Sequence, residues 1–435
     1  MMMPATERMY MLMPVTLFPT HLGGIIAAPA SKSEAHRRMI CAGLSCCETM
    51  LDGFMESEDM AATRRCLKAL GAEMTINGEK LTIRGASCRV FGTPEMDCGE
   101  SGSTLRFFVP IAMARANGGV FQMRGRLSQR PMDVYRDLFV PQGASWRMGV
   151  GADGVAELHV LGRLACGNYE LPGNVSSQFV SGLLFALPLL ERESTLTVLP
   201  PVESAGYIAM TLEALRDSGI TVEEIAPFSW RIPGNQQYKP QSGRISADYS
   251  QAAVLLCAAA LGHDITVTGL CANTTQGDRI VLDHLRTMGA VVTETEQGIT
   301  VDGSARHGAT LDMRSCPDIA PILALCCQLT EGESRLTGCG RLRLKESDRL
   351  QATVDILNAL GGNARIDGDD IVIMGVKQLK GGVTVDTVKD HRMVMLASIA
   401  ALHADAPVTL NEIDSIRKSW PEYFAAYQAL GGRIE

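Results

Sequence analysis

The chain has 435 residues, of which 46% are hydrophobic and 20% are charged, and its formal net charge is −8. This length usually divides into two domains or a set of repeats, and this composition excludes a disordered chain, a fibre and an integral membrane protein. The net negative charge argues against general nucleic-acid binding, so an anionic ligand would need a local cluster of cations.

The start of the chain and the cysteines indicate the compartment. The first dozen residues are rich in Met but carry Glu7 and Arg8, and they lack the apolar segment and cleavage site of a signal peptide. We expect them to form a loose extension. The thirteen cysteines include no Cys-x-x-Cys pair, which predicts small buried side chains in a reducing, cytoplasmic environment. No spacing typical of a metal site is present.

One pattern occurs six times along the chain. Each copy begins with an Ala-rich apolar helix, followed by a β-branched strand and a second helix that ends at a glycine. After the glycine come a strand, a turn and another strand. The glycines are spaced by 72, 76, 70, 72 and 70 residues, and they are Gly71, Gly143, Gly219, Gly289, Gly361 and Gly431. Glycine suits this place because the residue after a helix often adopts a left-handed conformation.

Polar residues open the first helix of each copy. They are spaced by 72, 72, 72, 70 and 72 residues, and they are Lys32, Thr104, Ser176, Asp248, Asp318 and Asp390. Asn-Gly and Asp-Gly turns, at residues 77–78 and 367–368, are typical of the hairpins that close a copy. The two periodicities predict an α/β fold of six βαβαββ-type modules of about 72 residues.

The ends of the chain suggest how the modules are grouped. The sixth copy stops at Glu435 with half of its hairpin missing, and a matching strand is present at residues 15–18, so we expect the two chain ends to complete one module. A polar Pro/Gly stretch at residues 233–240 separates the third copy from the fourth. We therefore expect two similar domains of three modules, residues 30–240 and residues 1–29 with 241–435, joined by a two-strand hinge. Ligands favour clefts between domains.

Cations stand beside several of the predicted helix starts. A helix N-terminus offers free N–H groups and a partial positive charge, and arginine holds a carboxylate or phosphate through two parallel hydrogen bonds. For any single Ser, Thr or Asp an ordinary N-cap is the simpler interpretation, but capping does not explain the cations. The sequence therefore predicts an anion-binding cleft formed by residues 31–37, 101–106, 126–130, 176–178, 345–349, 390–392 and 417–418.

Five segments, in this order, resemble the signatures of the 5-enolpyruvylshikimate-3-phosphate synthase family. They are residues 31–37, 99–106, 176–178, 345–349 and 390–393. The resemblance covers nearly the whole chain and extends to the six-module, two-domain plan. It implies transfer of the enolpyruvyl group of phosphoenolpyruvate to the 5-hydroxyl of shikimate 3-phosphate, with release of phosphate, on the shikimate route to chorismate and aromatic amino acids. It implies no metal or organic cofactor, and we expect a monomer acting on small molecules, without a nucleic-acid or membrane partner.

The resemblance also implies roles for matching residues. Shikimate 3-phosphate would be bound by Lys32, Ser33, Arg37, Ser176, Ser177, Gln178, Ser204, Tyr207, Asp318 and Lys345. Phosphoenolpyruvate would be bound by Lys32, Gly102, Arg106, Arg126, Gln178, Arg349, Arg392 and Lys418. Asp318 would accept the hydroxyl proton and Glu346 would protonate the methylene, with Lys32 as the competing proton donor. For Asp318 the alternative is a simple N-cap, and for Tyr207 a half-buried aromatic side chain at a helix start.

Two positions depart from the family pattern. Glu100 and Arg341 stand where many members have Asn, which leaves the fine geometry of the phosphoenolpyruvate pocket open.

Two alternative functions remain. The related transferase that acts on UDP-N-acetylglucosamine typically has Lys-Asn at the place of Lys32 and Ser33, and a Cys where this chain has Gly125. A non-catalytic protein of the same fold would not need to keep Lys32, Asp318 and Glu346 together.

Overall fold

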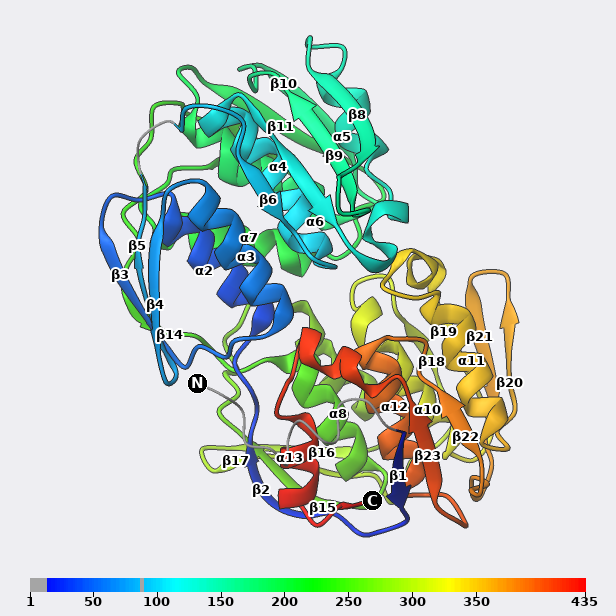
Figure 1. Ribbon diagram of the computed structural model, residues 1–435. Coiled ribbons are helices and arrows are strands. Elements are labelled where there is room, and N and C mark those ends of the chain that lie inside the picture. The colour runs from blue at the N-terminus through cyan, green and yellow to red at the C-terminus, as the bar shows by residue number, and fades with distance from the viewer. Residues whose placement is uncertain (1–13, 87–89) are drawn as a thin grey trace. The chain divides into compact units, whose positions relative to one another are not determined.

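The computed structural model describes residues 14–86 and 90–435 of the chain. The predicted loose extension at the start lies outside the described residues. The chain divides into two compact units, in which unit 2 is residues 30–246, and unit 1 is the segment up to residue 29 together with residues 247–435 (Figure 1). The second crossing follows Ser246 rather than Pro240, because Gly243–Arg244 pairs in parallel with Leu51 and Asp52 and so belongs to unit 2.

Unit 2 contains the first three modules. The helices are α2 (Lys32–Gly43), α3 (Glu58–Ala69), α4 (Gly102–Ala116), α5 (Asp133–Phe139), α6 (Ser177–Ala186) and α7 (Ala205–Asp217), with 3-10 helices η1 (Gly125–Gln129) and η2 (Leu187–Leu189). The strands are β3 (Glu48–Asp52), β4 (Glu73–Asn77), β5 (Lys80–Arg84), β6 (Glu95–Asp97), β7 (Gly118–Met123), β8 (Ser145–Val150), β9 (Ala156–Leu161), β10 (Asn168–Pro172), β11 (Ser194–Leu199), β12 (Glu223–Ala226), β13 (Ser229–Ile232) and β14 (Gly243–Arg244).

Unit 1 contains the other three modules. Its helices are α8 (Tyr249–Ala260), α9 (Val281–Thr287), α10 (Ala320–Gln328), α11 (Arg349–Ala359), α12 (His391–Ala401) and α13 (Tyr423–Ala429), with η3 (Gly277–Ile280), η4 (Pro317–Ile319), η5 (Gly340–Leu344) and η6 (Ile413–Lys418). Its strands are β1 (Val15–Phe18), β2 (Gly23–Ala27), β15 (Asp264–Thr268), β16 (Val291–Thr295), β17 (Gly298–Asp302), β18 (Thr310–Asp312), β19 (Glu333–Thr337), β20 (Ala364–Asp367), β21 (Asp370–Met374), β22 (Thr384–Asp386), β23 (Val408–Asn411) and β24 (Arg433–Ile434).

Within the described residues, six four-stranded sheets share one topology. In the order β6-β7-β9-β8, for example, the first pair is parallel and the other two pairs are antiparallel. The sheet of the last module joins the chain ends, because β1 pairs antiparallel with both β23 and β24. The prediction that residues 15–18 complete the sixth module is therefore confirmed.

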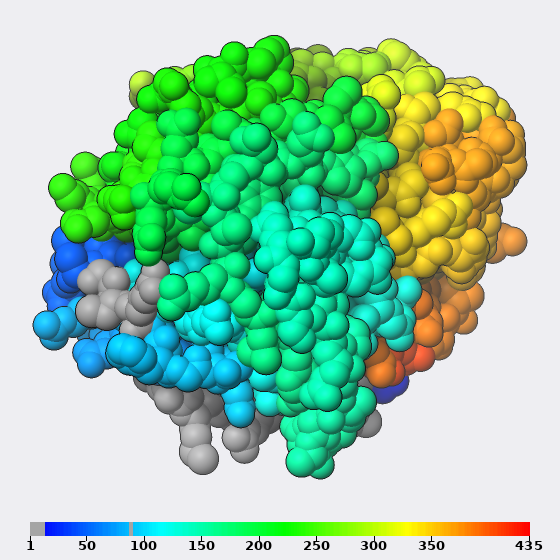
Figure 2. Space-filling view, turned by 90° about the horizontal axis from the view of Figure 1, so that it is seen from above, coloured from blue at the N-terminus to red at the C-terminus, as the bar shows by residue number. Residues whose placement is uncertain are grey.

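The first helix of each module lies in the interior of its unit. All twelve residues of α8 are buried, as its Ala-rich, apolar sequence requires of a helix without a polar face. In unit 2 the hydrophobic core gathers around α4 and α6, while the sheets form the outer layer (Figure 1). Figure 2 shows one face of unit 2, on which its three modules follow one another from blue through turquoise to green.

The glycines of the repeat take the predicted conformation. Gly71, Gly143, Gly219, Gly289, Gly361 and Gly431 all have φ between 72° and 99°. This left-handed backbone strains residues that have a side chain. Glycine therefore recurs once in each module, at the residue that follows the second helix. The cysteines of the described residues are free thiols, most of them buried, and none of the described helices is long and apolar enough to cross a bilayer.

Candidate functional site

Five of the six first helices begin at a capping side chain. Each side chain accepts a hydrogen bond from a backbone N–H of the first turn, and the caps are Ser31, Ser101, Ser176, Asp248 and Asp390. The helix predicted to open at Thr104 begins two residues earlier, at Gly102. Asp318 differs, because it lies inside the 3-10 helix η4 and the following helix α10 begins at Ala320. The N-cap alternative for Asp318 is therefore wrong.

In unit 2, the start of α2 brings together three residues predicted to bind substrate. The Lys32 ammonium donates a hydrogen bond to Asp59 of α3 at 2.7 Å. The buried Arg37 donates from Nη1 to the backbone carbonyl of Ser33 (2.7 Å) and from Nη2 to that of Tyr207 (2.8 Å). Burial lowers the pKa of Arg37 to about 10, so this arginine keeps its charge at neutral pH. Arg37 thereby ties the start of α2 to the start of α7.

The starts of α4 and α6 meet through one amide side chain. Gln178 accepts a hydrogen bond from Arg106 Nη1 at 2.6 Å and donates from Nε2 to the hydroxyl of Ser103 at 2.8 Å. The Arg106 guanidinium also donates to the carbonyl of Pro131 (3.0 Å) and lies 4.9 Å from the ring centroid of Phe179. Ser177, the first residue of α6, is buried beside Gln178. Two predicted phosphoenolpyruvate ligands, Arg106 and Gln178, thus contact each other directly.

The structure brings a second arginine to the start of α4. Arg126, the residue named from the sequence, is exposed on η1. Arg130 lies against Gly102 instead, since a Cβ atom on this glycine would be 2.5 Å from Arg130 Nη1. Glu100, which departs from the family pattern, packs on Gly125, where a Cβ would be 2.5 Å from the carboxylate carbon. Sequence reasoning placed Arg130 in the cationic segment but gave it no role.

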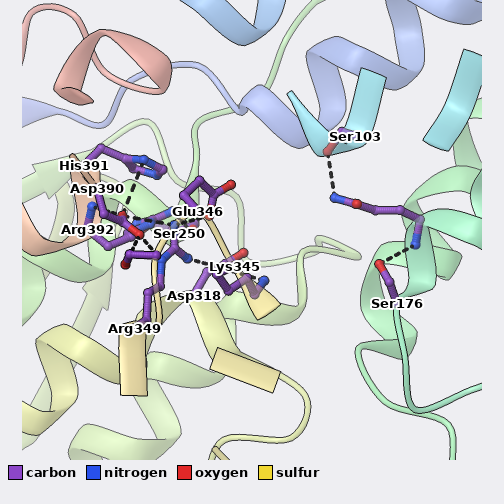
Figure 3. Close-up of polar contacts among 12 residues, drawn as sticks. Ser103, Ser176, Ser250, Asp318, Lys345, Glu346, Arg349, Asp390, His391 and Arg392 are labelled. Carbon is purple, nitrogen blue, oxygen red and sulfur yellow. Dashed lines mark hydrogen bonds and ion pairs between the residues drawn. The ribbon is translucent and has the colours of Figure 1, made fainter. Parts of the chain in front are cut away.

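In unit 1, Asp318 lies at the centre of an ion-pair network. Its Oδ1 accepts hydrogen bonds from Lys345 Nζ at 2.9 Å and from Arg349 Nη1 at 2.7 Å (Figure 3). The buried Arg349 guanidinium also donates to Glu346 (2.6 Å) and, from Nε, to Asp390 (2.8 Å). Three acids from two modules are therefore held by one arginine.

The network fixes the charge of its members. Burial alone would raise the pKa of Asp318, but the positive charges of Lys345, Arg349 and Arg392 hold it well below its ordinary value. Burial lowers the pKa of Lys345, and the Asp318 carboxylate opposes this shift. The pKa of Arg349 is raised because Asp390, Glu346 and Asp318 outweigh its burial. Asp318 is thus an ionised carboxylate next to two cations at neutral pH.

Arg392 and Lys418 complete the predicted cations of unit 1. Arg392 Nη1 donates to the Ser250 carbonyl at 2.8 Å, and Nη2 donates to the Ser250 hydroxyl (Figure 3). Lys418 is buried and donates to the carbonyl of Lys389 at 3.2 Å.

Asp278 of η3 is a buried acid that sequence reasoning did not single out. Burial and the charge of Asp318 raise its pKa to about 6, while Arg392 acts in the opposite direction. The site in unit 1 thus combines the lowered pKa of the Asp318 carboxylate with the raised pKa of Asp278. Among the residues that the structure describes, no group of three or more His, Cys, Asp or Glu side chains could hold a metal ion.

Two units of three βαβαββ modules, with cations at the helix starts of both, define an α/β protein suited to anionic ligands. The chain belongs to the EPSP synthase (3-phosphoshikimate 1-carboxyvinyltransferase) family, whose sequence model it matches over residues 18–426. A 3-phosphoshikimate 1-carboxyvinyltransferase from Clostridium perfringens is 38% identical over 423 residues, which cover 97% of this chain and 99% of the relative. One from Clostridium botulinum is 39% identical over 424 residues, covering 96% and 97%.

Solved structures agree with this family. EPSP synthase from Acinetobacter baumannii superposes with a TM-score of 0.78 at 25% sequence identity, over 97% of this chain and 99% of that one. The enolpyruvyl transferase NikO from Streptomyces tendae gives a TM-score of 0.78 at 18% identity, over 97% and 98% of the two chains. This second likeness concerns the fold alone.

Proposed function

We propose that this protein catalyses the reaction for which its family is named, the transfer of the enolpyruvyl group of phosphoenolpyruvate to the 5-hydroxyl of shikimate 3-phosphate. The observation that carries the proposal is the Asp318 carboxylate, held at 2.9 Å from Lys345 and 2.7 Å from Arg349 in a member of this family. An ionised acceptor between two cations suits a reaction that removes a proton from a hydroxyl beside anionic groups. The transfer to a UDP-linked amino sugar is not favoured, because the matched family is a different one.

Shikimate 3-phosphate binds to unit 2 in this proposal. Its ligands there are Lys32, Ser33, Arg37, Ser176, Ser177, Gln178, Ser204 and Tyr207. Serine hydroxyls and helix N-termini form a shell suited to a phosphate. Arg37 has a double role, since it supplies positive charge and its hydrogen bonds fix the backbones of Ser33 and Tyr207.

Phosphoenolpyruvate binds to Lys32, Gly102, Arg106, Arg126, Gln178, Arg349, Arg392 and Lys418. Arg130 joins this set, because its guanidinium lies against Gly102 whereas Arg126 is exposed. The proposal requires unit 2 and unit 1 to act as two domains on the same pair of substrates, which we attribute to closure about the two-strand hinge.

The reaction proceeds by addition and elimination. A proton is added to the methylene carbon of phosphoenolpyruvate, and the 5-hydroxyl oxygen forms a bond to the adjacent carbon while its proton passes to Asp318. The tetrahedral intermediate then returns one methyl proton to the group that protonated the methylene, the carbon–oxygen bond to phosphate breaks, and the enol ether remains. Lys418 and the arginines stabilise the departing phosphate. Once substrate anions neutralise part of the charge of Lys345 and Arg349, the proton affinity of Asp318 rises, which suits its role as base.

The test is phosphate release from phosphoenolpyruvate, measured with and without shikimate 3-phosphate. We expect release only when both substrates are present, with 5-enolpyruvylshikimate 3-phosphate as the other product. Activity should survive chelation of divalent ions, and the active species should have the mass of one chain and act in the cytoplasm. Release with UDP-N-acetylglucosamine in place of shikimate 3-phosphate would favour the alternative transferase. If no phosphate were released with either acceptor, a non-catalytic protein would be favoured.

A further inference from the structure

Three buried hydroxyl groups occupy equivalent positions in the modules of unit 2. Thr63, Tyr135 and Thr211 each precede the repeat glycine of their module by eight residues, at Gly71, Gly143 and Gly219. All three belong to the second helix of a module, and all three are fully buried. A hydroxyl in such a place has to be hydrogen-bonded within the protein, because an unpaired buried donor is costly.

Thr63 of α3 links α2 to α4. Its Oγ1 lies 2.8 Å from Nδ1 of His36 and 2.8 Å from Oγ1 of Thr104. Thr104 donates its own hydroxyl proton to Ser101 at 2.8 Å, so Thr63 donates to Thr104 and His36 donates to Thr63. His36 is neutral, because burial, with the nearby charges of Lys32 and Arg37, holds its pKa well below the ordinary value. The chain of hydrogen bonds ends at the cap of α4.

Tyr135 of α5 links α4 to α6. Its hydroxyl lies 2.9 Å from the carbonyl of Arg106 on α4 and 2.8 Å from that of Phe179 on α6. The two helices approach closely at Gly182, where a Cβ would be 2.3 Å from the tyrosine oxygen and 2.4 Å from the Arg106 carbonyl. The hydroxyl therefore occupies a space that the missing side chain of Gly182 leaves open.

Thr211 of α7 links α6 back to α2. Its Oγ1 lies 2.7 Å from the Ser181 hydroxyl on α6 and accepts a hydrogen bond from Arg37 Nε on α2 at 2.8 Å. Because Thr211 donates its own proton to the carbonyl of Tyr207 at 3.0 Å, Ser181 is the donor of the first bond. The third link closes a ring in which each second helix joins two first helices.

The equivalent positions of unit 1 do not repeat this ring. They are Val281, Thr353 and Tyr423, each eight residues before a repeat glycine. Valine has no hydrogen-bonding group, and the hydroxyl of Thr353 donates to the carbonyl of Arg349 on its own helix at 2.7 Å. The hydroxyl of Tyr423 lies 2.5 Å from that of Ser398 on α12, which links it to one first helix rather than two. The ring is thus a property of unit 2 rather than of the module.

We propose that Thr63, Tyr135 and Thr211 are positioning residues, which hold the starts of α2, α4 and α6 at the spacing that the substrates require. This inference rests on the proposed function, since those starts carry Lys32, Gly102, Arg106 and Gln178. Each link has its own expected effect. The Thr63 link ends at the cap of α4, where phosphoenolpyruvate is proposed to bind, whereas the Thr211 link joins α2 and α6, which are proposed to bind shikimate 3-phosphate.

The test compares Michaelis constants, because loss of folded protein lowers the apparent kcat but leaves KM unchanged. We expect Thr63→Val to raise KM for phosphoenolpyruvate by a factor of roughly 3–10, the equivalent of about one hydrogen bond, with a smaller effect on shikimate 3-phosphate. Thr211→Val should show the opposite selectivity. Thr63→Ser and Thr211→Ser keep the hydroxyl and should restore both constants. Thr330→Val in unit 1, whose buried hydroxyl donates to the carbonyl of Cys326 at 2.6 Å, is the control and should leave both constants unchanged.

A further variant separates the loss of a hydrogen bond from misfolding. Tyr135→Phe removes only the hydroxyl oxygen, keeps the ring packing, and should raise KM for phosphoenolpyruvate. The inference would be overturned if the Michaelis constants were unchanged and only the melting temperature fell in soluble Tyr135→Phe, Thr63→Val and Thr211→Val proteins. The proposed function would not be affected by that result. An unmodified protein without turnover would overturn both.

Discussion

The carboxylate of Asp390 accepts two hydrogen bonds from the guanidinium of Arg349, from Nε at 2.8 Å and from Nη2 at 3.2 Å, and both side chains are buried. Asp390 also accepts from the Ser347 hydroxyl at 2.9 Å and caps α12 through the backbone N–H of Arg392. Burial would raise the pKa of Asp390, but Arg349 holds it below its ordinary value. One acid therefore orients two of the proposed phosphoenolpyruvate ligands.

Removing this acid should cost stability and binding together. Asp390→Ala leaves Arg349 partly unpaired in the interior, and breaking a buried pair in this way costs about 3–5 kcal/mol. We expect a fall of this order in the free energy of unfolding, measured by denaturant titration, and a raised KM for phosphoenolpyruvate. Asp367→Ala removes the partner of Arg335 from an exposed pair and serves as the control, with an expected change below about 1 kcal/mol. Equal effects of the two substitutions would contradict the role given to Asp390.

The buried His263 and the half-buried His403 of unit 1 should make its stability depend on pH. His263 packs between His403 and His21, with ring centroids 5.0 and 5.2 Å apart. Burial, together with His403 and His21, lowers the pKa of His263 to about 4, although Asp264 opposes the shift. Burial and the charge of Arg306 lower the pKa of His403 to about 4.

The direction of the effect follows from proton uptake. The unfolded chain binds more protons than the folded chain between about pH 6.5 and pH 4. The contribution of the two histidines to the free energy of unfolding is therefore complete above about pH 6.5 and is lost as the pH falls through this window. Melting temperatures measured across this range should decrease on acidification, and His403→Gln should flatten the decrease. An identical pH dependence in the variant would exclude His403 as a contributor.

The start of α4 should not tolerate a methyl group. In Gly102→Ala the new Cβ would lie 2.5 Å from Arg130 Nη1, so the guanidinium has to move from the place where phosphoenolpyruvate is proposed to bind. We expect KM for phosphoenolpyruvate to rise by about tenfold or more, with little change in melting temperature, because the end of a long side chain moves at small cost. Gly23→Ala, on β2, where the nearest atom would be 3.7 Å from the new Cβ, is a control for the general effect of adding a methyl group. If Gly102→Ala kept the original KM, Arg130 would not line the pocket.

Two residues compete for the proton that enters the methylene carbon. Glu346 accepts a hydrogen bond from Arg349 at 2.6 Å, and Lys32 donates one to Asp59 at 2.7 Å. Glu346→Gln keeps the shape of the side chain and should lower kcat by a factor of about 10²–10⁴ if Glu346 is the acid. Exchange of solvent deuterium into the methylene group of the product's enolpyruvyl side chain should fall with kcat. A Glu346→Gln protein with normal exchange, beside a Lys32→Met protein without it, would assign the proton to Lys32.

The sequence predicted those features that depend on short segments and on the repeat. The glycine after each second helix is required by local backbone geometry, so Gly71 and Gly431 could be placed without knowledge of their neighbours. The strand at residues 15–18 could be paired with the chain end because the last module lacked its complement. Lys345, Glu346 and Arg349 could be grouped because they lie on one short segment.

Other features depend on how distant segments pack. Arg126 and Arg130 lie four residues apart, and only the path of the chain after η1 decides which guanidinium reaches Gly102. Asp278 lies on the short 3-10 helix η3, with nothing in the neighbouring sequence to mark it as buried. The ring of hydroxyls does have a signal, the constant distance of eight residues to the repeat glycine, but Thr and Tyr at that position do not resemble each other. Their common role becomes visible only through the hydrogen bonds.

The most direct test of the account is turnover in Asp318→Asn. This substitution removes the negative charge but keeps the size of the side chain, and it leaves the proposed shikimate 3-phosphate ligands of unit 2 intact. We predict that phosphate release from phosphoenolpyruvate falls by a factor of about 10²–10⁴ while the dissociation constant of shikimate 3-phosphate changes by less than about threefold. An Asp318→Asn protein that is folded, binds shikimate 3-phosphate and releases phosphate at the unmodified rate would contradict the assignment of Asp318 as the base.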